Sequence, residues 1–328
     1  MTARTPTVAV LDAMPAASLR VIEEIFTPAY ALAAADDGTP AAKRVAARDA
    51  DVLLTMWGSV DADTIAAAPH ARVIQKLGVG VDKIDATAAA ARGVVVLKAA
   101  GINADAVAEL AVLLTLAVGR HYDKATAAAR KGLLAKEELR AESFQLLGRR
   151  YGLLGFGAIG RAVATRMAGF GVEIVYYDLA PVDPAVERAC HARYVEQDEL
   201  IGTADVISLH LPSTPGTDRI VDESFLARTK PGVIIVNTAR GSLIDEPALA
   251  RAVASGQVLG AGLDVTAQEP IAADSPLLGL ERVVLTPHVG GAVADNFPRV
   301  IRRAYDNAEA VLHGGSVDPA DVVVWPGR

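Results

Sequence analysis

The stretch RRYGLLGFGAIGRAVATRMAGFGVEIVYYD, residues 149–178, decides the fold of this chain. Its apolar residues 151–154 predict a buried strand, and apolar residues at helical spacing over 161–170 predict a helix. A second apolar run, 172–177, predicts another strand that ends at Asp178. The order strand, glycine turn, helix, strand and acid is typical of a βαβ unit in a parallel sheet.

The glycines of this stretch indicate a dinucleotide site. Gly155, Gly157 and Gly160 have the spacing G-x-G-x-x-G. The first permits the tight turn, the second lets the backbone approach a pyrophosphate, and the third lets the helix pack close to its strand. The N-terminus of that helix supplies free N–H groups and the positive end of its dipole. We therefore expect dinucleotide binding rather than an ordinary βα turn.

The acid at the end of the second strand favours NAD over NADP. Asp178 lies 18 residues beyond Gly160, close to the spacing at which a carboxylate accepts the ribose hydroxyls of NAD. The same carboxylate would repel a 2′-phosphate, and residues 179–181 offer no Arg or Lys to bind one.

Composition limits the class of protein. The 328 residues suffice for two domains, and with a net charge of −7 and no basic run longer than two residues, nucleic acid is not an expected partner. The single cysteine, Cys190, excludes an intramolecular disulfide and a cysteine-built metal site, so we predict no metal and a cytoplasmic protein. No uncharged apolar run reaches membrane-spanning length, so no membrane association is expected.

The remainder of the chain alternates between predicted strands and helices. The strands are expected at 7–11, 51–55, 73–77, 94–97, 205–210, 231–237, 260–265 and 282–286. The helices are expected at 16–26, 61–68, 84–91, 103–120 and about 293–313, followed by a short tail. Asp61 is placed to cap one helix and Gly93 to end another. Residues 121–148 are more polar and predict a surface excursion.

Polar residues gather just past the predicted strand ends, where open parallel sheets bind ligands. They are His210, Arg240, Asp264, Glu269 and His288. Each alone has a structural explanation, such as a surface ion pair, a turn or a loop histidine. Together they suggest one reaction: an arginine holds a carboxylate bidentately, and an imidazolium favoured by a neighbouring carboxylate protonates a carbonyl oxygen. Beside a nicotinamide, this set suits a 2-oxo acid that accepts hydride.

Seven motifs in order resemble the D-isomer-specific 2-hydroxyacid dehydrogenase family over nearly the whole chain. They are LGVGVDKID at 77–85, GINADAVAEL at 101–110, YGLLGFGAIGRAVA at 151–164, HLPSTPGT at 210–217, PGVIIVNTARGSLIDEPAL at 231–249, GAGLDVTAQEP at 260–270 and TPHVGG at 286–291.

The resemblance implies the role of each site residue. Arg240 orients the substrate carboxylate and carbonyl, Glu269 partners the histidine, and His288 is the acid/base. Arg240 and His288 also contact both substrate and cofactor. The other implied cofactor contacts are Gly155, Gly157, Ala158, Ile159, Gly160, Asp178, His210, Leu211, Pro212, Thr217, Thr238, Ala239, Asp264, Gly290 and Gly291. The other implied substrate contacts are Gly78, Val79 and Gly80, with Trp57 as either a pocket wall or a packing residue.

The family also implies an α/β fold of two doubly wound parallel-sheet domains. Residues 1–100 and 292–328 are expected to form a flavodoxin-like substrate domain, and residues 101–291 a Rossmann domain that binds NAD. The helix at 103–120 and the excursion after it resemble the family's dimer arm, so a homodimer is expected. Lys76 is expected to be solvated or salt-bridged, or else to meet a second anionic group of the substrate.

The resemblance implies an NAD-dependent oxidoreductase that interconverts a small D-2-hydroxy acid and its 2-oxo acid by hydride transfer. One alternative is a dehydrogenase of another small anion, such as phosphite; formate is disfavoured because formate dehydrogenases resemble this family but carry glutamine where this chain has Glu269. Another is a corepressor-like protein that senses the dinucleotide without turning it over. Glyoxylate, hydroxypyruvate and a phosphorylated hydroxy acid all remain open as substrates.

Overall fold

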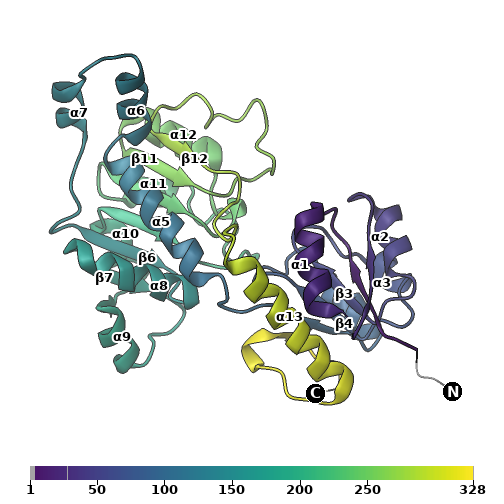
Figure 1. The fold of residues 1–328 in the computed structure, drawn as a ribbon. Helices are drawn as coiled ribbons and strands as arrows, with labels where there is room; N and C mark the ends of the chain where they lie inside the picture. Colours follow the sequence, from purple (N-terminus) through teal and green to yellow (C-terminus); the bar gives the residue numbers. More distant parts are fainter. Residues whose placement is uncertain (1–3, 28, 328) are drawn as a thin grey trace. The chain divides into compact units, whose positions relative to one another are not determined.

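The computed structural model describes residues 4–27 and 29–327. The chain divides into two compact units: unit 1 comprises residues 1–103 and 294–328, and unit 2 comprises residues 104–293 (Figure 1). Unit 1 is therefore assembled from both ends of the chain, whereas unit 2 is continuous.

Unit 1 is built on one mixed sheet. Its strands are β1 (Thr7–Val10), β2 (Ala31–Ala34), β3 (Val52–Thr55), β4 (Val73–Lys76), β5 (Val95–Leu97) and β13 (Val322–Val324). The spatial order is β13-β5-β4-β3-β1-β2, and all pairs are parallel except β13 with β5. The order β2-β1-β3-β4-β5 is that of flavodoxin-like sheets, which confirms the expected fold. The sequence analysis placed a short tail after the last helix and no element in it; Val322–Val324 of that tail pairs with β5 at the edge of the sheet.

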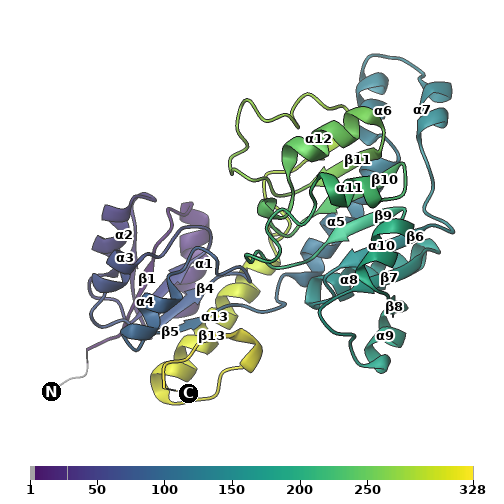
Figure 2. The same cartoon turned by 180° about the vertical axis from the view of Figure 1, so that it is seen from behind.

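Helices cover both faces of this sheet. They are α1 (Ala16–Phe26), α2 (Pro40–Ala47), α3 (Ala62–Ala66), α4 (Ala86–Ala91) and α13 (Asn296–His313), with a short 3-10 helix η3 (Pro319–Asp321). One core packs α1 and α13 against one face, and the other packs α2, α3 and α4 against the opposite face (Figure 2).

Unit 2 is built on a parallel sheet. Its strands are β6 (Arg150–Leu154), β7 (Glu173–Tyr177), β8 (Ala192–Tyr194), β9 (Val206–Leu209), β10 (Val233–Asn237), β11 (Val258–Leu263) and β12 (Val283–Leu285). The spatial order is β12-β11-β10-β9-β6-β7-β8, and every pair is parallel. From β6 the chain first adds β7 and β8 on one side and then β9 to β12 on the other side. This is the doubly wound order of a Rossmann domain, and it confirms the second part of the expected fold.

The helices of unit 2 also form two layers. They are α5 (Ala104–Gly119), α6 (Tyr122–Arg130), α7 (Lys136–Glu142), α8 (Ala158–Met167), α9 (Pro184–Cys190), α10 (Gln197–Thr203), α11 (Glu223–Arg228) and α12 (Glu246–Ser255), with 3-10 helices η1 (Ala168–Phe170) and η2 (Gly241–Leu243). Buried residues of α5, α8 and α9 pack on one face, and those of α10, α11 and α12 on the other. Because both faces are covered, β9 and β10 are buried along their whole length, as their apolar runs predict.

The helix cap and the helix-ending glycine lie where the sequence predicts them. The Asp61 carboxylate accepts a hydrogen bond of 2.8 Å from the Thr64 backbone N–H and caps α3, and Gly93 follows α4 with a φ of +72°. The α8 helix starts at Ala158, three residues earlier than expected, because it begins directly at the glycine turn. The excursion after α5 contains α6 and α7, neither of which has a buried residue.

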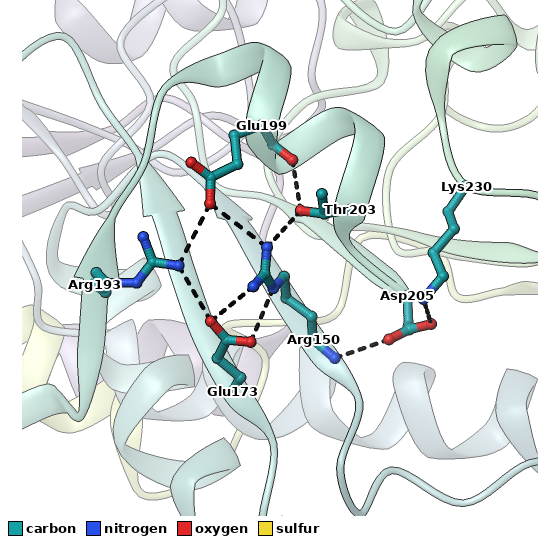
Figure 3. A network of polar contacts seen from close by, with 7 residues as sticks. All are labelled: Arg150, Glu173, Arg193, Glu199, Thr203, Asp205 and Lys230. Atoms are coloured by element: carbon teal, nitrogen blue, oxygen red, sulfur yellow. Dashed lines mark hydrogen bonds and ion pairs between the residues drawn. The ribbon is translucent and has the colours of Figure 1, made fainter.

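The amino-terminal edge of the unit 2 sheet, where its parallel strands begin, carries an ion-pair network (Figure 3). The Arg150 guanidinium donates to both Glu173 carboxylate oxygens, at 2.9 and 3.0 Å, and Arg193 lies between Glu173 and Glu199. The Asp205 carboxylate accepts from Lys230 Nζ at 2.6 Å and from the Arg150 backbone N–H at 2.9 Å. Burial raises the pKa of Asp205, but these donors outweigh burial and hold its pKa below the usual value.

We predict that Asp205→Asn lowers the free energy of unfolding at pH 7 by about 2 kcal/mol, since two charge-assisted hydrogen bonds lose their anionic acceptor. A lowered carboxyl pKa adds stability above the unfolded pKa of about 4, and this stability disappears as pH falls through the folded pKa. Urea unfolding should therefore show that the difference in the free energy of unfolding between wild type and variant is smaller at pH 3 than at pH 7.

Asp198→Asn is the matched control, because the ion pair of Asp198 with Arg228 is exposed, at 87% and 51% of the two side chains. It should change stability by no more than about 0.5 kcal/mol at either pH. If the loss of unfolding free energy in Asp205→Asn were the same at both pH values, the ionised Asp205 carboxylate would not be its cause.

Candidate active site

The glycine turn lies between β6 and α8, and two of its glycines are required by the chain itself. Gly155 has a φ of +93°, and a Cβ there would lie 2.6 Å from the His210 carbonyl oxygen. A Cβ on Gly160 would lie 2.4 Å from the carbonyl oxygen of Gly155. These contacts hold the turn against the end of β9, as the sequence motif predicts.

The middle glycine has open space instead. A Cβ on Gly157 would meet no described atom within 4 Å, and the backbone there is extended. Gly157 is the N-cap of α8, and no side chain of the described residues caps this helix. The first N–H groups, those of Ala158 and Ile159 among them, therefore lie at an uncapped positive helix end that fits a pyrophosphate.

Asp178 directly follows β7, beside this turn. Its carboxylate accepts hydrogen bonds from the backbone N–H groups of Phe156, at 2.7 Å, and Leu179, at 2.8 Å. The acid is thus joined to the glycine turn by a direct bond. Only the structure shows this bond, because residues 156 and 178 are 22 positions apart.

His210 follows β9 and adjoins the same turn. Its Nε2 lies 2.9 Å from the Ser208 hydroxyl, and its Nδ1 is buried without a hydrogen-bond partner among the described residues. Burial lowers the pKa of His210 to about 3, so the imidazole is neutral at ordinary pH. In the loop that follows, the Thr217 hydroxyl donates to the Pro212 carbonyl at 2.7 Å, which fixes the backbone at Leu211 and Pro212.

Asn237, which the sequence analysis did not single out, shapes the turn that carries Arg240. This buried residue ends β10; its side-chain N–H₂ donates to the Arg240 carbonyl at 2.8 Å, and its side-chain oxygen accepts from the Ala239 N–H at 2.9 Å. The available signal was an amide at the end of an apolar run. The Thr238 hydroxyl oxygen is buried without a partner among the described residues, as a ligand-facing group would be.

Gly241 brings this turn against the loop after β11. A Cβ at Gly241 would lie 1.9 Å from the Thr266 carbonyl oxygen, so only glycine fits. Arg240 and the segment that leads to Glu269 are therefore neighbours. The Arg240 guanidinium donates to the Ala239 carbonyl at 2.6 Å.

His288 and Glu269 form a pair at the same edge. The Nδ1 atom of His288 lies 3.0 and 3.1 Å from the two carboxylate oxygens of Glu269. The side chains are 49% and 34% exposed, so the pair adds little to stability. Because a carboxylate can only accept, Nδ1 is the donor, and Nε2 is left to take up or release a proton.

The remaining predicted cofactor contacts lie around this pair. Asp264, at the end of β11, is 2% exposed and accepts from the Gly290 N–H at 2.8 Å. Gly291 follows in the same loop, and its carbonyl accepts from the Val293 N–H at 3.0 Å. The structure thus gathers Arg240, Glu269, His288 and the predicted cofactor contacts in unit 2, past the carboxyl ends of its strands.

The predicted substrate contacts belong to unit 1. Trp57 is 50% exposed, and Gly78, Val79 and Gly80 follow β4. The loop that carries Trp57 is held from within: the buried Asp12 carboxylate accepts from the Gly58 N–H at 2.7 Å, and the buried Lys43 ammonium donates to the Ser59 carbonyl at 2.8 Å.

Lys76 takes part in the same unit. Its ammonium donates to the Met56 carbonyl, so it braces the Trp57 loop. Asp12 and Lys43 carried no signal in the sequence, because an acid after a strand and a lysine in a short helix are usually exposed.

Residues 4–27 and 29–327 contain neither a metal-binding cluster nor a membrane-spanning helix. No group of His, Cys, Asp or Glu side chains in this range is arranged to hold a metal ion. Likewise, none of its helices has the length and apolar character to span a membrane.

We predict that Gly157→Ala weakens NADH binding while leaving the fold intact. The new methyl group meets no described atom, so thermal stability should change by less than about 1 kcal/mol. The methyl would occupy the space through which the pyrophosphate approaches the backbone, so Kd for NADH, measured by fluorescence titration, should rise roughly tenfold or more.

Gly169→Ala is the matched control, since a Cβ at Gly169 also meets nothing within 4 Å. Its Kd for NADH should equal that of the wild type. Equal affinities for all three proteins would show that Gly157 does not face the cofactor.

Comparison with known proteins agrees with this geometry. Residues 112–290 match the model of the NAD-binding domain of D-isomer specific 2-hydroxyacid dehydrogenases. The chain is 42% identical over 286 residues to the D-3-phosphoglycerate dehydrogenase of Mycobacterium leprae, a match that covers 87% of this chain and 53% of that protein. It is 36% identical over 315 residues to the glyoxylate reductase of Korarchaeum cryptofilum, covering 94% and 93%.

A solved structure shares the fold over the same length. The TT0316 protein of Thermus thermophilus superimposes with a TM-score of 0.85 at 35% identity, over 97% of this chain and 100% of that one. The chain spans about half the length of the first phosphoglycerate dehydrogenases that it matches. By the matched domain and these identities, the chain belongs to the D-isomer specific 2-hydroxyacid dehydrogenase family, and its cofactor is NAD.

Proposed function

We propose that the protein is an NAD-dependent oxidoreductase that interconverts a small D-2-hydroxy acid and its 2-oxo acid. The observation that carries the proposal is the His288–Glu269 pair, with Nδ1 held at 3.0 Å from the carboxylate and Nε2 left for chemistry. The pair shares its sheet edge with Arg240 and the glycine turn. The names of two relatives, glyoxylate reductase and D-3-phosphoglycerate dehydrogenase, support a hydroxy or oxo acid substrate.

The side chains divide the work between binding and proton transfer. Arg240 binds the substrate carboxylate, since a guanidinium matches two carboxylate oxygens at once. During reduction, His288 gives the proton on Nε2 to the carbonyl oxygen, and during oxidation it takes that proton back. The Glu269 carboxylate stabilises the charged imidazole and fixes its tautomer. NAD, when bound, supplies or accepts the hydride.

The proposal also assigns the two units. Unit 2 would serve as the cofactor domain, with Gly155, Gly157, Gly160 and Asp178 toward NAD. Unit 1 would serve as the substrate domain, with Trp57 and residues 78–80 as its substrate contacts. The direct test is NADH oxidation by the purified protein against a panel of 2-oxo acids that includes glyoxylate and hydroxypyruvate. Tight NADH binding without turnover of any member would favour a dinucleotide sensor instead.

We predict that Glu269→Gln lowers kcat for reduction by roughly tenfold or more. The amide neither stabilises the imidazolium form of His288 nor holds its tautomer as the carboxylate 3.0 Å away does. His288→Ala should lower kcat by roughly a hundredfold or more, the scale of general acid–base catalysis, with NADH binding retained.

The measurement is kcat and KM for reduction, determined separately at neutral pH. Arg240→Ala is the contrast, because loss of the carboxylate grip should mainly raise KM for the 2-oxo acid. An unchanged kcat in Glu269→Gln would show that Glu269 does not assist His288.

We further propose a homodimer formed through α5 and residues 121–148. Figure 1 shows α6 and α7 projecting from the body of unit 2, and neither helix has a buried residue. Leu133 and Leu134 between them are 60% and 87% exposed, and Leu113 on α5 is 57% exposed. Apolar side chains exposed in this density on a segment without a core of its own favour burial against a second copy.

We predict a dimer mass by light scattering at micromolar concentration. Leu134→Asp should shift the protein toward monomer, because the interface would have to bury a charge. Val45→Asp, at a 64% exposed apolar position on α2, is the control and should leave the mass unchanged. A monomeric wild type would contradict the proposal.

A further inference from the structure

One buried carboxylate, that of Asp264, holds the segment that carries His288. The Thr286 hydroxyl donates to Oδ1 at 2.6 Å, and the Val289 N–H donates to the same oxygen at 2.8 Å. The Gly290 N–H donates to Oδ2 at 2.8 Å. Both carboxylate oxygens are therefore engaged by residues on either side of His288.

The backbone of Asp264 extends this set of bonds. Its carbonyl accepts the His288 N–H at 2.7 Å, and its own N–H donates to the Asn237 carbonyl at 2.9 Å. Since Asn237 is the last residue of the fully buried β10, the His288 segment is tied through Asp264 to an interior strand of the sheet. Gly290 adds a steric constraint, because a Cβ there would lie 3.0 Å from Oδ2 of Asp264.

The conformation of His288 needs such a support. Its φ is +54°, in the left-handed region, where a residue other than glycine is held only by the surrounding structure. In this conformation Nδ1 reaches Glu269 at 3.0 Å. If the bonds to Asp264 were lost, the segment would relax toward an ordinary backbone and the ring would leave Glu269.

The chemistry of the donors requires an acid at this position. Three donors meet two oxygens, and only a carboxylate accepts on both. In an asparagine, either orientation of the amide would place its N–H₂ group against a backbone N–H, that of Val289 or that of Gly290. The isosteric change Asp264→Asn would therefore break hydrogen bonds around residue 264 without leaving a cavity.

We propose that Asp264 is a positioning residue for His288: it sets the backbone of residues 286–290 so that Nδ1 meets Glu269 and Nε2 stays available. This role adds to the nicotinamide-side contact that the family resemblance implies for Asp264. The inference rests on the proposed function of His288 as acid/base.

The first test is Asp264→Asn in the full chain. The kcat for reduction of the best 2-oxo acid should fall about a hundredfold, the scale of a misplaced catalytic group. KM for the 2-oxo acid should stay within about threefold of the wild type, because no substrate-binding group is removed. Kd for NADH, measured separately, reports the nicotinamide-side contact implied for Asp264. A tenfold weaker Kd with unchanged kcat would make Asp264 a cofactor contact only, and would overturn the inference.

A double-mutant cycle with Glu269→Gln tests the route of the effect. If Asp264 acts through the His288–Glu269 pair, the double variant should lose much less kcat than the product of the two single losses. Losses that multiply would show that Asp264 acts elsewhere.

Thr286 provides a milder matched pair in case Asp264→Asn does not fold. Thr286→Val keeps the volume and removes one of the three donors, and kcat should fall roughly tenfold. Thr286→Ser keeps the hydroxyl and should restore kcat to near the wild-type value. Equal kcat for the Val and Ser variants would overturn the inference.

A crystal structure of the Asp264→Asn or Thr286→Val variant gives a readout without turnover. The inference requires the distance from His288 Nδ1 to Glu269 to grow beyond hydrogen-bond range in Asp264→Asn, or to lengthen measurably in Thr286→Val. An unchanged pair would refute it even if activity is lost. A displaced pair in a protein whose wild type reduces no 2-oxo acid would support the positioning role and refute only the proposed reaction.

Discussion

The parallel pairing of β6 with β7 and β9 is the constraint on which the rest of unit 2 depends. Parallel strands all end at one edge, so this register brings the glycine turn, Asp178 and His210 together although 55 positions separate Gly155 from His210. The contact is tight enough that no Cβ fits at Gly155 against the His210 carbonyl. The pairing therefore determines both the fold and the place of the dinucleotide.

Strand ends in this sheet carry buried polar side chains that build the site indirectly. Asn237 is fully buried and Asp264 is 2% exposed. The Asn237 side chain bonds the backbone of the turn that follows it, and the Asp264 side chain bonds the backbone of the loop after β12. Buried polar groups of this kind are costly unless every donor and acceptor is matched. Because they are matched here, the turns that carry Arg240 and His288 are held by the core of the sheet, while the reactive side chains themselves stay partly exposed.

The two edges of the sheet differ in chemistry. The amino-terminal edge, with Arg150, Glu173 and Asp205, has its charges paired with one another, which stabilises the sheet and leaves little for a ligand. The carboxyl edge keeps buried atoms without partners among the described residues, namely His210 Nδ1 and the Thr238 hydroxyl oxygen. Unmatched polar atoms at one edge and matched ions at the other fit the rule that open parallel sheets bind ligands past their carboxyl ends.

The sequence by itself determined the alternation of strands and helices, the glycine turn, the acid at 178 and the catalytic candidates Arg240, Glu269 and His288. These signals are local: apolar periodicity, glycines at fixed spacing and polar residues directly after apolar runs each lie within one segment. The edge strands β2, β8 and β13 were not predicted. None of them has a buried residue, and each gains its strand pairing from a single neighbour, β1, β7 or β5. The tertiary structure alone likewise decided which polar side chains are buried as supports of the site loops, namely those of Asp12, Lys43, Asn237 and Asp264. Each depends on a hydrogen bond between segments far apart in the chain, and a polar residue in a sequence does not reveal whether its partner will be water or a distant backbone group.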